Sequence, residues 1–341
     1  MADTLSQARG RIARDVRSID MSSRLPRVAH LEPDKTGWNF FLCTRKDVRV
    51  GKSGEYLALV LQDATGQVAG RVFDGVDRFK HEFEIGEFVR AEGRTSMHNG
   101  ELQLVASVIR RVNPEQDAAQ GFREEDCIPS APRPIGDMWT ELLALVEALE
   151  HRHLRVFLLR LLTDHEAALR DWPAAQTVHH AYRGGLLEHI LSMATAGKAL
   201  AKHYGAREDL LVAGAIIHDI GKLQELAYDN GAISYTRDGN LIGHIALGLV
   251  MVREAAKGVS GFPDDVRAEL EHLVVSHHGA RDKGSPVEPK SVEAFILSAV
   301  DDLDAKLHQV RSALGEGSAE AEFTGWHRRF GRVLYRGVRE S

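Results

Sequence analysis

One stretch of the chain is almost entirely apolar, yet it contains a histidine next to an aspartate. Residues 210–226 read LLVAGAIIHDIGKLQEL, and we expect a central helix that is buried nearly all round. Burial of the carboxylate of Asp219 without a partner would be costly, and a metal ion held by His218 and Asp219 would remove that cost. Imidazole together with carboxylate suits Mn, Fe, Zn or Mg. The stretch therefore predicts a buried metal centre in a helical domain.

More side chains of the same kind lie beside apolar positions of other predicted helices. They are His189, His244, His277, His278 and Asp301. A single histidine on an apolar face is more often a hydrogen-bonded core residue than a ligand, and a His-His pair near a helix end is often a cap. The joint occurrence of these residues on five helical segments favours one shared centre.

The first third of the chain has a different pattern. Short alternating runs occur at 38–43, 56–62, 68–73, 88–93 and 102–111, with Gly-containing turns between them. Five such strands predict a small antiparallel barrel over 24–113, preceded by an arm at 1–23. Trp38, Phe40, Phe73 and Arg71 are candidates for contacts with bases, although aromatic residues at alternating strand positions are more often core.

The second part of the chain is predicted to be helical. Residues 114–136 are rich in proline, glycine and charge, which is typical of a linker. An apolar helical period begins at 137, and helices are expected at 244–257, 263–278 and 289–313. We expect a helical domain at 137–315 and a basic tail at 316–341. The fold class is therefore multidomain α and β, a barrel followed by an all-α domain.

Composition excludes several classes of protein. The formal net charge is −6, which argues against a wholly basic nucleic-acid binder. Two cysteines far apart in sequence, Cys43 and Cys127, predict no disulfide framework, and they favour a reducing compartment such as the cytoplasm. No apolar run of about 18 residues occurs, so no membrane span is expected.

The order His, His-Asp, Asp resembles the HD-domain superfamily of metal-dependent phosphohydrolases, and the additional histidines resemble its dinuclear subgroup. The chain is most similar to the YhaM-type 3′-to-5′ exoribonuclease family, which joins an N-terminal OB-fold to an HD domain. The runs that carry the resemblance are PAAQTVHHAYRGGLLEH, HDIGK, GHI, SHHG, GSPVEPKSVEA and VDDLDAK.

The resemblance implies two divalent ions, with Mn²⁺ expected first and Mg²⁺ or Fe²⁺ as alternatives. One ion would be held by His189, His218, Asp219 and Asp301, and the other by Asp219 as a bridge with His244, His277 and His278. A mononuclear site would instead leave His244 and the His-His pair to contact phosphate. Asp219 and Lys222 would be the catalytic residues, with the ammonium of Lys222 at the phosphate. His179, His180 and Arg183 would contact substrate, although a helix-surface role fits them equally well.

The implied activity is 3′-to-5′ hydrolysis of single-stranded RNA to nucleoside 5′-monophosphates, with single-stranded DNA as a second substrate. A homo-oligomer would suit such an enzyme. One alternative is an HD phosphohydrolase that acts on free or cyclic nucleotides. HD enzymes that cleave cyclic dinucleotides carry a GYP motif after the His-His pair, whereas this chain reads HHGARDKGSPVEPK there. A second alternative is a non-catalytic nucleic-acid-binding protein.

Overall fold

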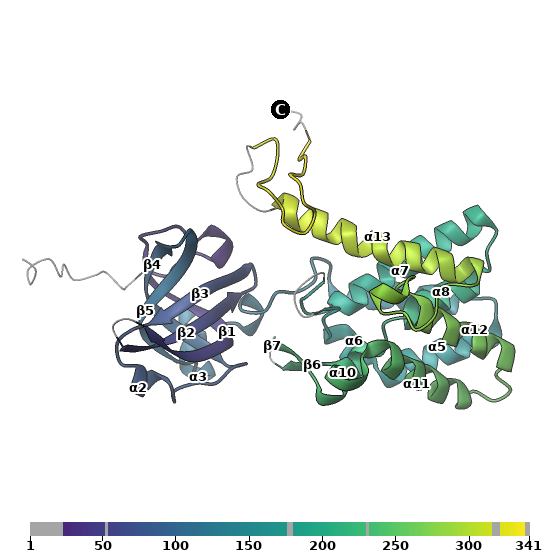
Figure 1. Cartoon of the computed structure of the whole chain (residues 1–341). Coiled ribbons are helices and arrows are strands. Elements are labelled where there is room, and N and C mark those ends of the chain that lie inside the picture. The colour runs from purple at the N-terminus through teal and green to yellow at the C-terminus, as the bar shows by residue number, and fades with distance from the viewer. Residues whose placement is uncertain (1–22, 52–53, 176–179, 230–231, 316–320, 338–341) are drawn as a thin grey trace, which may run out of the picture. The chain divides into compact units, whose positions relative to one another are not determined.

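The computed structural model describes residues 23–51, 54–175, 180–229, 232–315 and 321–337. The chain divides into two compact units (Figure 1). The barrel unit ends at Pro129 and includes the short segment Asp229–Ala232, and the helical unit comprises the remainder from Ser130. In the part of the chain that is described, no helix has both the length and the apolar character needed to cross a bilayer.

Five strands form a closed barrel in the order β1-β2-β3-β5-β4. The elements of this unit are η1 (Val28–His30), β1 (Thr36–Gly51), β2 (Gly54–Asp63), β3 (Gly66–Val72), α2 (Val76–Phe79), β4 (Phe88–His98), β5 (Glu101–Arg111), α3 (Pro114–Asp117), η2 (Ala118–Gln120) and η3 (Glu124–Asp126). All strand pairs are antiparallel except β3 with β5, which closes the barrel. The predicted five-stranded barrel is confirmed.

Alternation along the strands places one set of side chains inside the barrel. Leu57, Leu59 and Leu61 of β2 and Leu104 of β5 are at most 1% exposed. A second, smaller apolar cluster joins Phe40 to Phe122 and to the free, buried Cys127. The linker predicted at 114–136 is therefore wrong for its first part, because residues up to 129 pack on the barrel.

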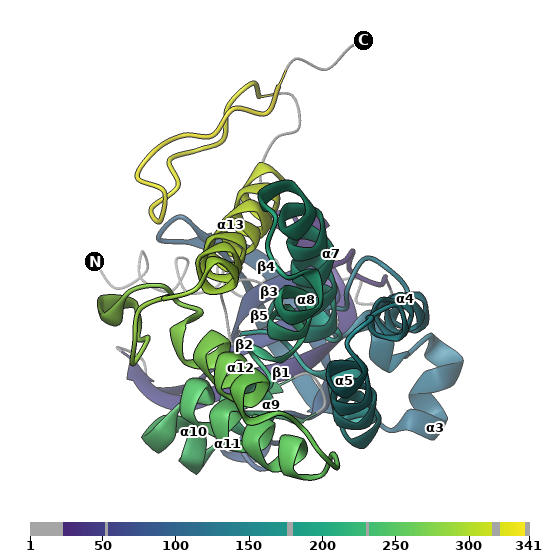
Figure 2. The same ribbon diagram turned by 90° about the vertical axis from the view of Figure 1, so that its right-hand side faces the viewer.

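The helical unit consists mainly of α-helices. They are α4 (Ile135–Glu147), α5 (Arg152–Asp164), α6 (Glu166–Asp171), α7 (Gly185–Tyr204), α8 (Glu208–Ile217), α9 (Lys222–Glu225), α10 (Arg237–Ile242), α11 (His244–Lys257), α12 (Asp264–Ser276) and α13 (Val292–Gly315), with η4 (Arg281–Lys283) and the hairpin of β6 (Leu226–Asp229) and β7 (Ala232–Tyr235). Helices α7, α8 and α13 pack against one another (Figure 2). The barrel followed by a helical domain confirms the predicted fold class.

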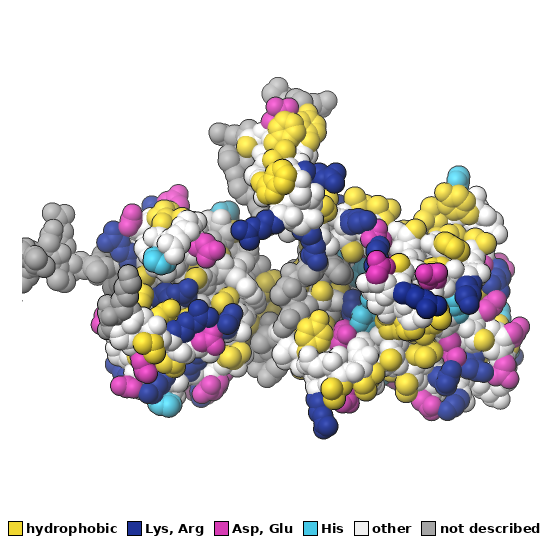
Figure 3. Space-filling model, in the orientation of Figure 1, with side chains coloured by type: hydrophobic (Ala, Val, Ile, Leu, Met, Phe, Trp, Pro, Cys, Tyr) yellow, Lys and Arg dark blue, Asp and Glu magenta, His cyan; other side chains and the backbone are white. Residues whose placement is uncertain are grey.

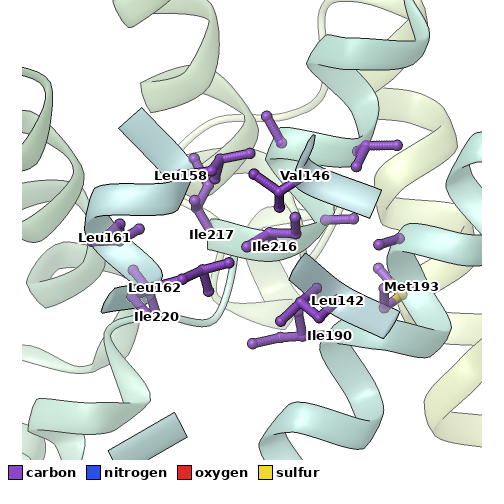
Figure 4. Close-up of a cluster of buried hydrophobic side chains, with 14 of the residues drawn as sticks. Leu142, Val146, Leu158, Leu161, Leu162, Ile190, Met193, Ile216, Ile217 and Ile220 are labelled. Atoms are coloured by element: carbon purple, nitrogen blue, oxygen red, sulfur yellow. The ribbon is translucent and has the colours of Figure 1, made fainter. Parts of the chain in front are cut away.

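One apolar core holds these helices together. Leu142 and Val146 of α4, Leu158 of α5, Ile190 of α7 and Ile216 of α8 are fully buried in it (Figure 4). Burial of a leucine or isoleucine side chain stabilises a fold by roughly 1.5–3 kcal/mol. Because α8 is surrounded by the other helices, the residues at its C-terminal end are held at the centre of the unit.

The continuous helix predicted at 210–226 is wrong. Helix α8 ends at Ile217, and a turn over residues 218–221 separates it from α9. At Gly221 a β-carbon would lie 2.0 Å from the carbonyl oxygen of His244, so the backbone of α11 approaches here closely enough to require glycine. The break lets His218 and Asp219 leave the helix and face the neighbouring helices.

Candidate metal centre

Five segments of the helical unit bring histidine and aspartate side chains to one place. His189 lies on α7, His218 and Asp219 on the turn after α8, and His244 is the first residue of α11. His277 and His278 follow α12, and Asp301 lies in the middle of α13. His189, His218, Asp219 and His277 are at most 2% exposed. These seven are the metal ligands that the resemblance implied.

One half of the cluster contains His189 and His218. Their Nε2 atoms lie 3.2 Å apart, and Oδ2 of Asp219 lies 3.6 Å from the first and 3.4 Å from the second. Oδ1 of Asp301 is 3.4 Å from Nε2 of His189. Ligand atoms that each lie about 2.1 Å from one ion are separated by about 3–3.5 Å, so these atoms fit a single metal ion.

The other half uses the second oxygen of Asp219. Its Oδ1 lies 3.6 Å from Nε2 of His244 and 3.7 Å from Nε2 of His277. His244, His277 and His278 also present nitrogen atoms close enough to one another to share an ion. The two carboxylate oxygens of Asp219 therefore face different sets of histidines, as a bridging ligand requires.

Three buried atoms of this second half have no hydrogen-bond partner in the described part of the chain. They are Oδ1 of Asp219, Nε2 of His244 and Nε2 of His277. An unsatisfied buried polar atom costs about 1–3 kcal/mol, and such atoms rarely occur in a group. A divalent cation among them would satisfy all three, so the residues fit the metal that the sequence predicted.

The backbone sets the orientation of three of the imidazole rings. Nδ1 of His218 donates to the carbonyl oxygen of Ala215 at 2.8 Å, and Nδ1 of His277 donates to that of Val274 at 2.7 Å. Nδ1 of His278 bonds the carbonyl oxygen of Lys283 at 3.0 Å. With the proton held on Nδ1, the lone pair of Nε2 faces the centre, which is the form that binds a metal.

Carboxylates orient the other two rings. Nδ1 of His189 lies 2.8 Å from Oδ2 of Asp304, whose other oxygen accepts from Ser192 at 2.5 Å. Oε1 of Glu225 lies 3.0 Å from Nδ1 of His244 and also accepts from the backbone nitrogen of that residue. Glu225 was not predicted from the sequence; its only signal was an acidic side chain near the end of the stretch that contains His218 and Asp219, between Leu223 and Leu226.

Electrostatics favour ionised carboxylates in this centre. Burial alone would raise the pKa of Asp219, but the charges of Lys222 and His218 hold that pKa well below its usual range. Burial lowers the pKa of His277 to about 3, so this ring is neutral and able to ligate. Burial also opposes protonation of His189, yet Asp301 and Asp304 raise its pKa to about 9. The carboxylates that raise the pKa of His189 would also stabilise a metal cation bound in place of its proton.

A small cavity of about 210 Å³ opens at the centre. Its lining includes Asp219, His277, His278 and Asp301 together with two lysines, Lys222 and Lys283. Nζ of Lys222 donates to Oδ2 of Asp219 at 2.5 Å, and Nζ of Lys283 lies 3.5 Å from Asp302. Lys283 was missed because the sequence gives no sign that η4 brings it beside His278.

Comparison with known proteins agrees with both units. An HD domain model matches residues 186–306, and an OB-fold nucleic acid binding domain model matches residues 44–112. The chain is 33% identical to the 3′-5′ exoribonuclease YhaM of Bacillus subtilis (strain 168) over 76% of this chain and 81% of that protein. It is 35% identical to YhaM of Geobacillus sp. (strain WCH70) over 79% of this chain and 81% of that protein. The chain belongs to the YhaM exoribonuclease family. All seven implied metal ligands of this YhaM-family chain lie within the HD match.

The residues predicted to contact substrate in the helical unit have different surroundings. His179 lies outside the described residues. His180 is 4% exposed and is held beside the centre, with Nδ1 2.8 Å from Glu188 and Nε2 3.3 Å from Asp304. Arg183 pairs with Asp171 and lines a separate cavity, so the structure does not bring Arg183 to the metal centre.

The barrel residues also differ from expectation. Phe40 is 2% exposed and its ring packs against Phe122, so the prediction that Phe40 contacts bases is wrong. Trp38 is half-buried beneath the guanidinium of Arg90, at 4.2 Å from the ring centroid. The segment after β5 covers the face of β1 that carries Phe40. The strand pattern in the sequence does not show whether such a face is covered or exposed to solvent.

An open aromatic pair lies elsewhere on the barrel. Leu57 and Val72 are paired across β2 and β3 and are fully buried, so alternation turns Tyr56 and Arg71 to the outer face. Phe73, directly after β3, is 52% exposed, and its ring centroid lies 5.5 Å from that of Tyr56. Of the predicted barrel contacts, Arg71 lies on this face with Phe73.

Proposed function

We propose that this chain is a metal-dependent 3′-to-5′ exonuclease that hydrolyses single-stranded RNA to nucleoside 5′-monophosphates, with single-stranded DNA as a further substrate. The convergence of His244 and His277 on the unpartnered Oδ1 of Asp219 supports the metal centre. The relatives named 3′-5′ exoribonuclease supply the substrate class and the direction.

Two divalent ions fit the ligand sets, with Mn²⁺ expected first and Mg²⁺ or Fe²⁺ as alternatives. His189, His218, Asp219 and Asp301 would hold one ion, and Asp219, His244, His277 and His278 the other. When bound, such ions activate water and neutralise the charge that develops on phosphoryl oxygens. Metal identity, cytoplasmic location and homo-oligomerisation stay predictions.

The chain's own lysines complete the proposed site. The charge of Lys222, whose ammonium also donates to Asp219, keeps Asp219 ionised, and Lys283 supplies a second ammonium to the lining of the cavity. Donors placed where charge develops stabilise a transition state without reorganisation. The cavity of about 210 Å³ is smaller than a typical ligand pocket of ~300–1,000 Å³, which suits one phosphodiester at a strand end.

The barrel would hold the rest of the strand. Tyr56, Arg71 and Phe73 share its outer face, and exposed aromatic and basic side chains are what single strands stack on and pair with. Contact between bases and this face is part of the proposal. Trp38, whose side chain is half-buried, remains a further candidate for contact with a base.

A time course on 5′-labelled RNA and DNA strands with Mn²⁺ tests the proposal. We expect a ladder that shortens from the 3′ end, with nucleoside 5′-monophosphates as products. Asp219→Ala removes the shared ligand and should slow the reaction by at least about 10³-fold, whereas Asp164→Ala, at an exposed helix position, should not. The proposal fails if Mn²⁺, Mg²⁺ and Fe²⁺ all leave the strands intact, or if Asp219→Ala retains full activity. Turnover of free or cyclic nucleotides in place of RNA would favour the alternative phosphohydrolase.

A further inference from the structure

Residues 322–336 form a hairpin with exposed aromatic and basic side chains. The backbone of Thr324 bonds Leu334 and that of His327 bonds Arg332, with bridges between Phe323 and Tyr335 and between His327 and Arg332. We call this segment the C-terminal hairpin. An isolated two-stranded hairpin is only marginally stable in water, so its exposed apolar side chains indicate a surface that a partner covers.

Three of the four large aromatic side chains of the C-terminal hairpin are exposed. Phe323, Trp326 and Tyr335 are all exposed, and Trp326 is 69% exposed. The ring of Trp326 has no aromatic neighbour among the described residues, so its exposed surface is available for stacking. Figure 3 shows hydrophobic and basic side chains together on the projecting end of the chain that Figure 1 colours yellow.

The charge of the C-terminal hairpin favours a polyanion as partner. Residues 321–337 contain four arginines and one glutamate, in a chain whose net charge is −6. Arg328 and Arg329 are exposed at the turn and form no ion pair with any residue that the structure describes. Two such hairpins from separate copies would repel each other, whereas phosphates would pair with the arginines and bases would stack on Trp326.

The hairpin is anchored at a definite distance from the metal centre. Arg336 donates to the carbonyl oxygen of Leu314 at 2.7 Å, near the end of the helix α13 that carries Asp301. Leu314 lies thirteen positions after Asp301 on the same helix, which corresponds to about 20 Å along the helix axis. A stacked strand advances about 3.4 Å per nucleotide, so roughly six nucleotides would bridge this distance.

We propose that the C-terminal hairpin binds the single-stranded RNA substrate several nucleotides away from the strand end in the metal centre. Trp326 stacks on a base, and Arg328 and Arg329 pair with backbone phosphates. This inference rests on the proposed exonuclease function, and it adds a second contact whose effect depends on substrate length.

The test compares RNA strands of about four and about twenty nucleotides. The first is shorter and the second longer than the roughly six nucleotides needed to span from the metal centre to the hairpin. A variant with Trp326→Ala, Arg328→Ala and Arg329→Ala is compared with a control carrying Tyr204→Ala and Arg152→Ala, both of which change exposed side chains elsewhere. For the long strand we expect the hairpin variant to raise KM by at least about fivefold with kcat unchanged. The short strand and the control should give wild-type kinetics.

Binding in the presence of a chelator supplies a second measurement that does not require hydrolysis. The affinity for the long strand should depend less on salt in the hairpin variant, with the slope of log affinity against log salt smaller by about 1.4 for two lost phosphate contacts. Anisotropy of a labelled strand gives this slope. Sedimentation of both variants reports whether the assembly has changed.

Three results would overturn the inference. They are unchanged kinetics and binding on the long strand, an equal loss on both lengths, and a change of molecular mass that shows the hairpin to be a contact between copies. If the wild-type protein cleaves neither strand, the proposed function has failed. The chelated binding measurement then still decides whether the hairpin holds RNA.

Discussion

Asp219 is the residue on which both halves of the candidate centre depend. Its two oxygens face different histidine sets, and Lys222 keeps it ionised despite burial. A neutral side chain of similar size would leave His244 and His277 without the anion that they share. Asp304 and Glu225 orient one histidine in each half of the centre. The contribution of each carboxylate to metal binding can be tested separately.

Asp304→Asn should weaken the half of the centre that contains His189. The amide can no longer accept both from His189 and from Ser192 as a carboxylate does, so the ring loses its fixed orientation. We expect metal affinity to fall by about 10–100-fold, measured by calorimetric titration with Mn²⁺. Asp302→Asn on the same helix, which contacts lysines rather than histidines, should leave the affinity unchanged. Equal affinities of all three proteins would refute this role.

Glu225→Gln should affect the other half of the centre. Glu225 accepts from both the ring and the backbone nitrogen of His244, so the substitution weakens the hold on one ligand of the second ion. We expect the affinity of one of the two binding steps to fall by about 10-fold while that of the other is retained. Metal stoichiometry at fixed free Mn²⁺ measures it, and a uniform shift of both steps would contradict the assignment.

At the scale of elements, the sequence predicted which segments carry the ligands but not how they meet. The period of apolar residues indicated α11, α12 and α13 to within a few residues of their bounds. The break after Ile217 was missed because it depends on a backbone contact between Gly221 and α11, and such a contact leaves no periodic signal. Likewise, alternation showed that Phe40 lies on a strand but not that Phe122 covers it.

Gly221→Ala tests that backbone contact. A β-carbon there would lie 2.0 Å from the carbonyl oxygen of His244 and 2.5 Å from the nitrogen of Gly248, and backbone atoms cannot yield as a side chain can. We expect α11 to shift, with a loss of about 1–3 kcal/mol in unfolding free energy and weaker binding of one ion. Gly315→Ala, which meets nothing within 4 Å, is the matched control. Denaturant unfolding and metal titration measure both effects, and wild-type values for Gly221→Ala would exclude a tight contact.

At the scale of the whole molecule, the two units have separate apolar cores, one inside the barrel and one among the helices. A ligand that binds only the folded helical unit should stabilise only that unit. Free Mn²⁺ at about 100 times its Kd adds about 2.7 kcal/mol to the unfolding free energy of that unit. For a unit of this size, the midpoint temperature of unfolding should rise by roughly 5–10 °C. Calorimetry with and without Mn²⁺ should show one transition that moves and one that does not. Movement of both by the same amount would show that the units unfold together.

A buried ion pair should make the stability of the barrel unit depend on pH. The guanidinium of Arg110 donates to both oxygens of Asp117, at 2.8 Å and 2.7 Å, and the carboxylate is fully buried. The hydrogen bond from Arg110 lowers the pKa of Asp117 below its usual value of 3.8. Since the pKa is lower in the folded state than in the unfolded one, the pair contributes stability above about pH 4. That stability is lost as pH falls through the lower, folded pKa.

Asp117→Asn removes this pH-dependent contribution and leaves the arginine without its counter-charge. We expect the variant to lose about 3 kcal/mol of barrel stability at neutral pH and to approach the wild type in strongly acidic solution, where Asp117 is protonated. Asp34→Asn is the control, because Asp34 pairs with Arg94 at an exposed position where an ion pair contributes about 0–1 kcal/mol. Denaturant unfolding of the barrel across this pH range measures the difference. A gap between Asp117→Asn and wild type that is constant with pH would mean that burial of the side chain, and not its charge, stabilises the segment after β5.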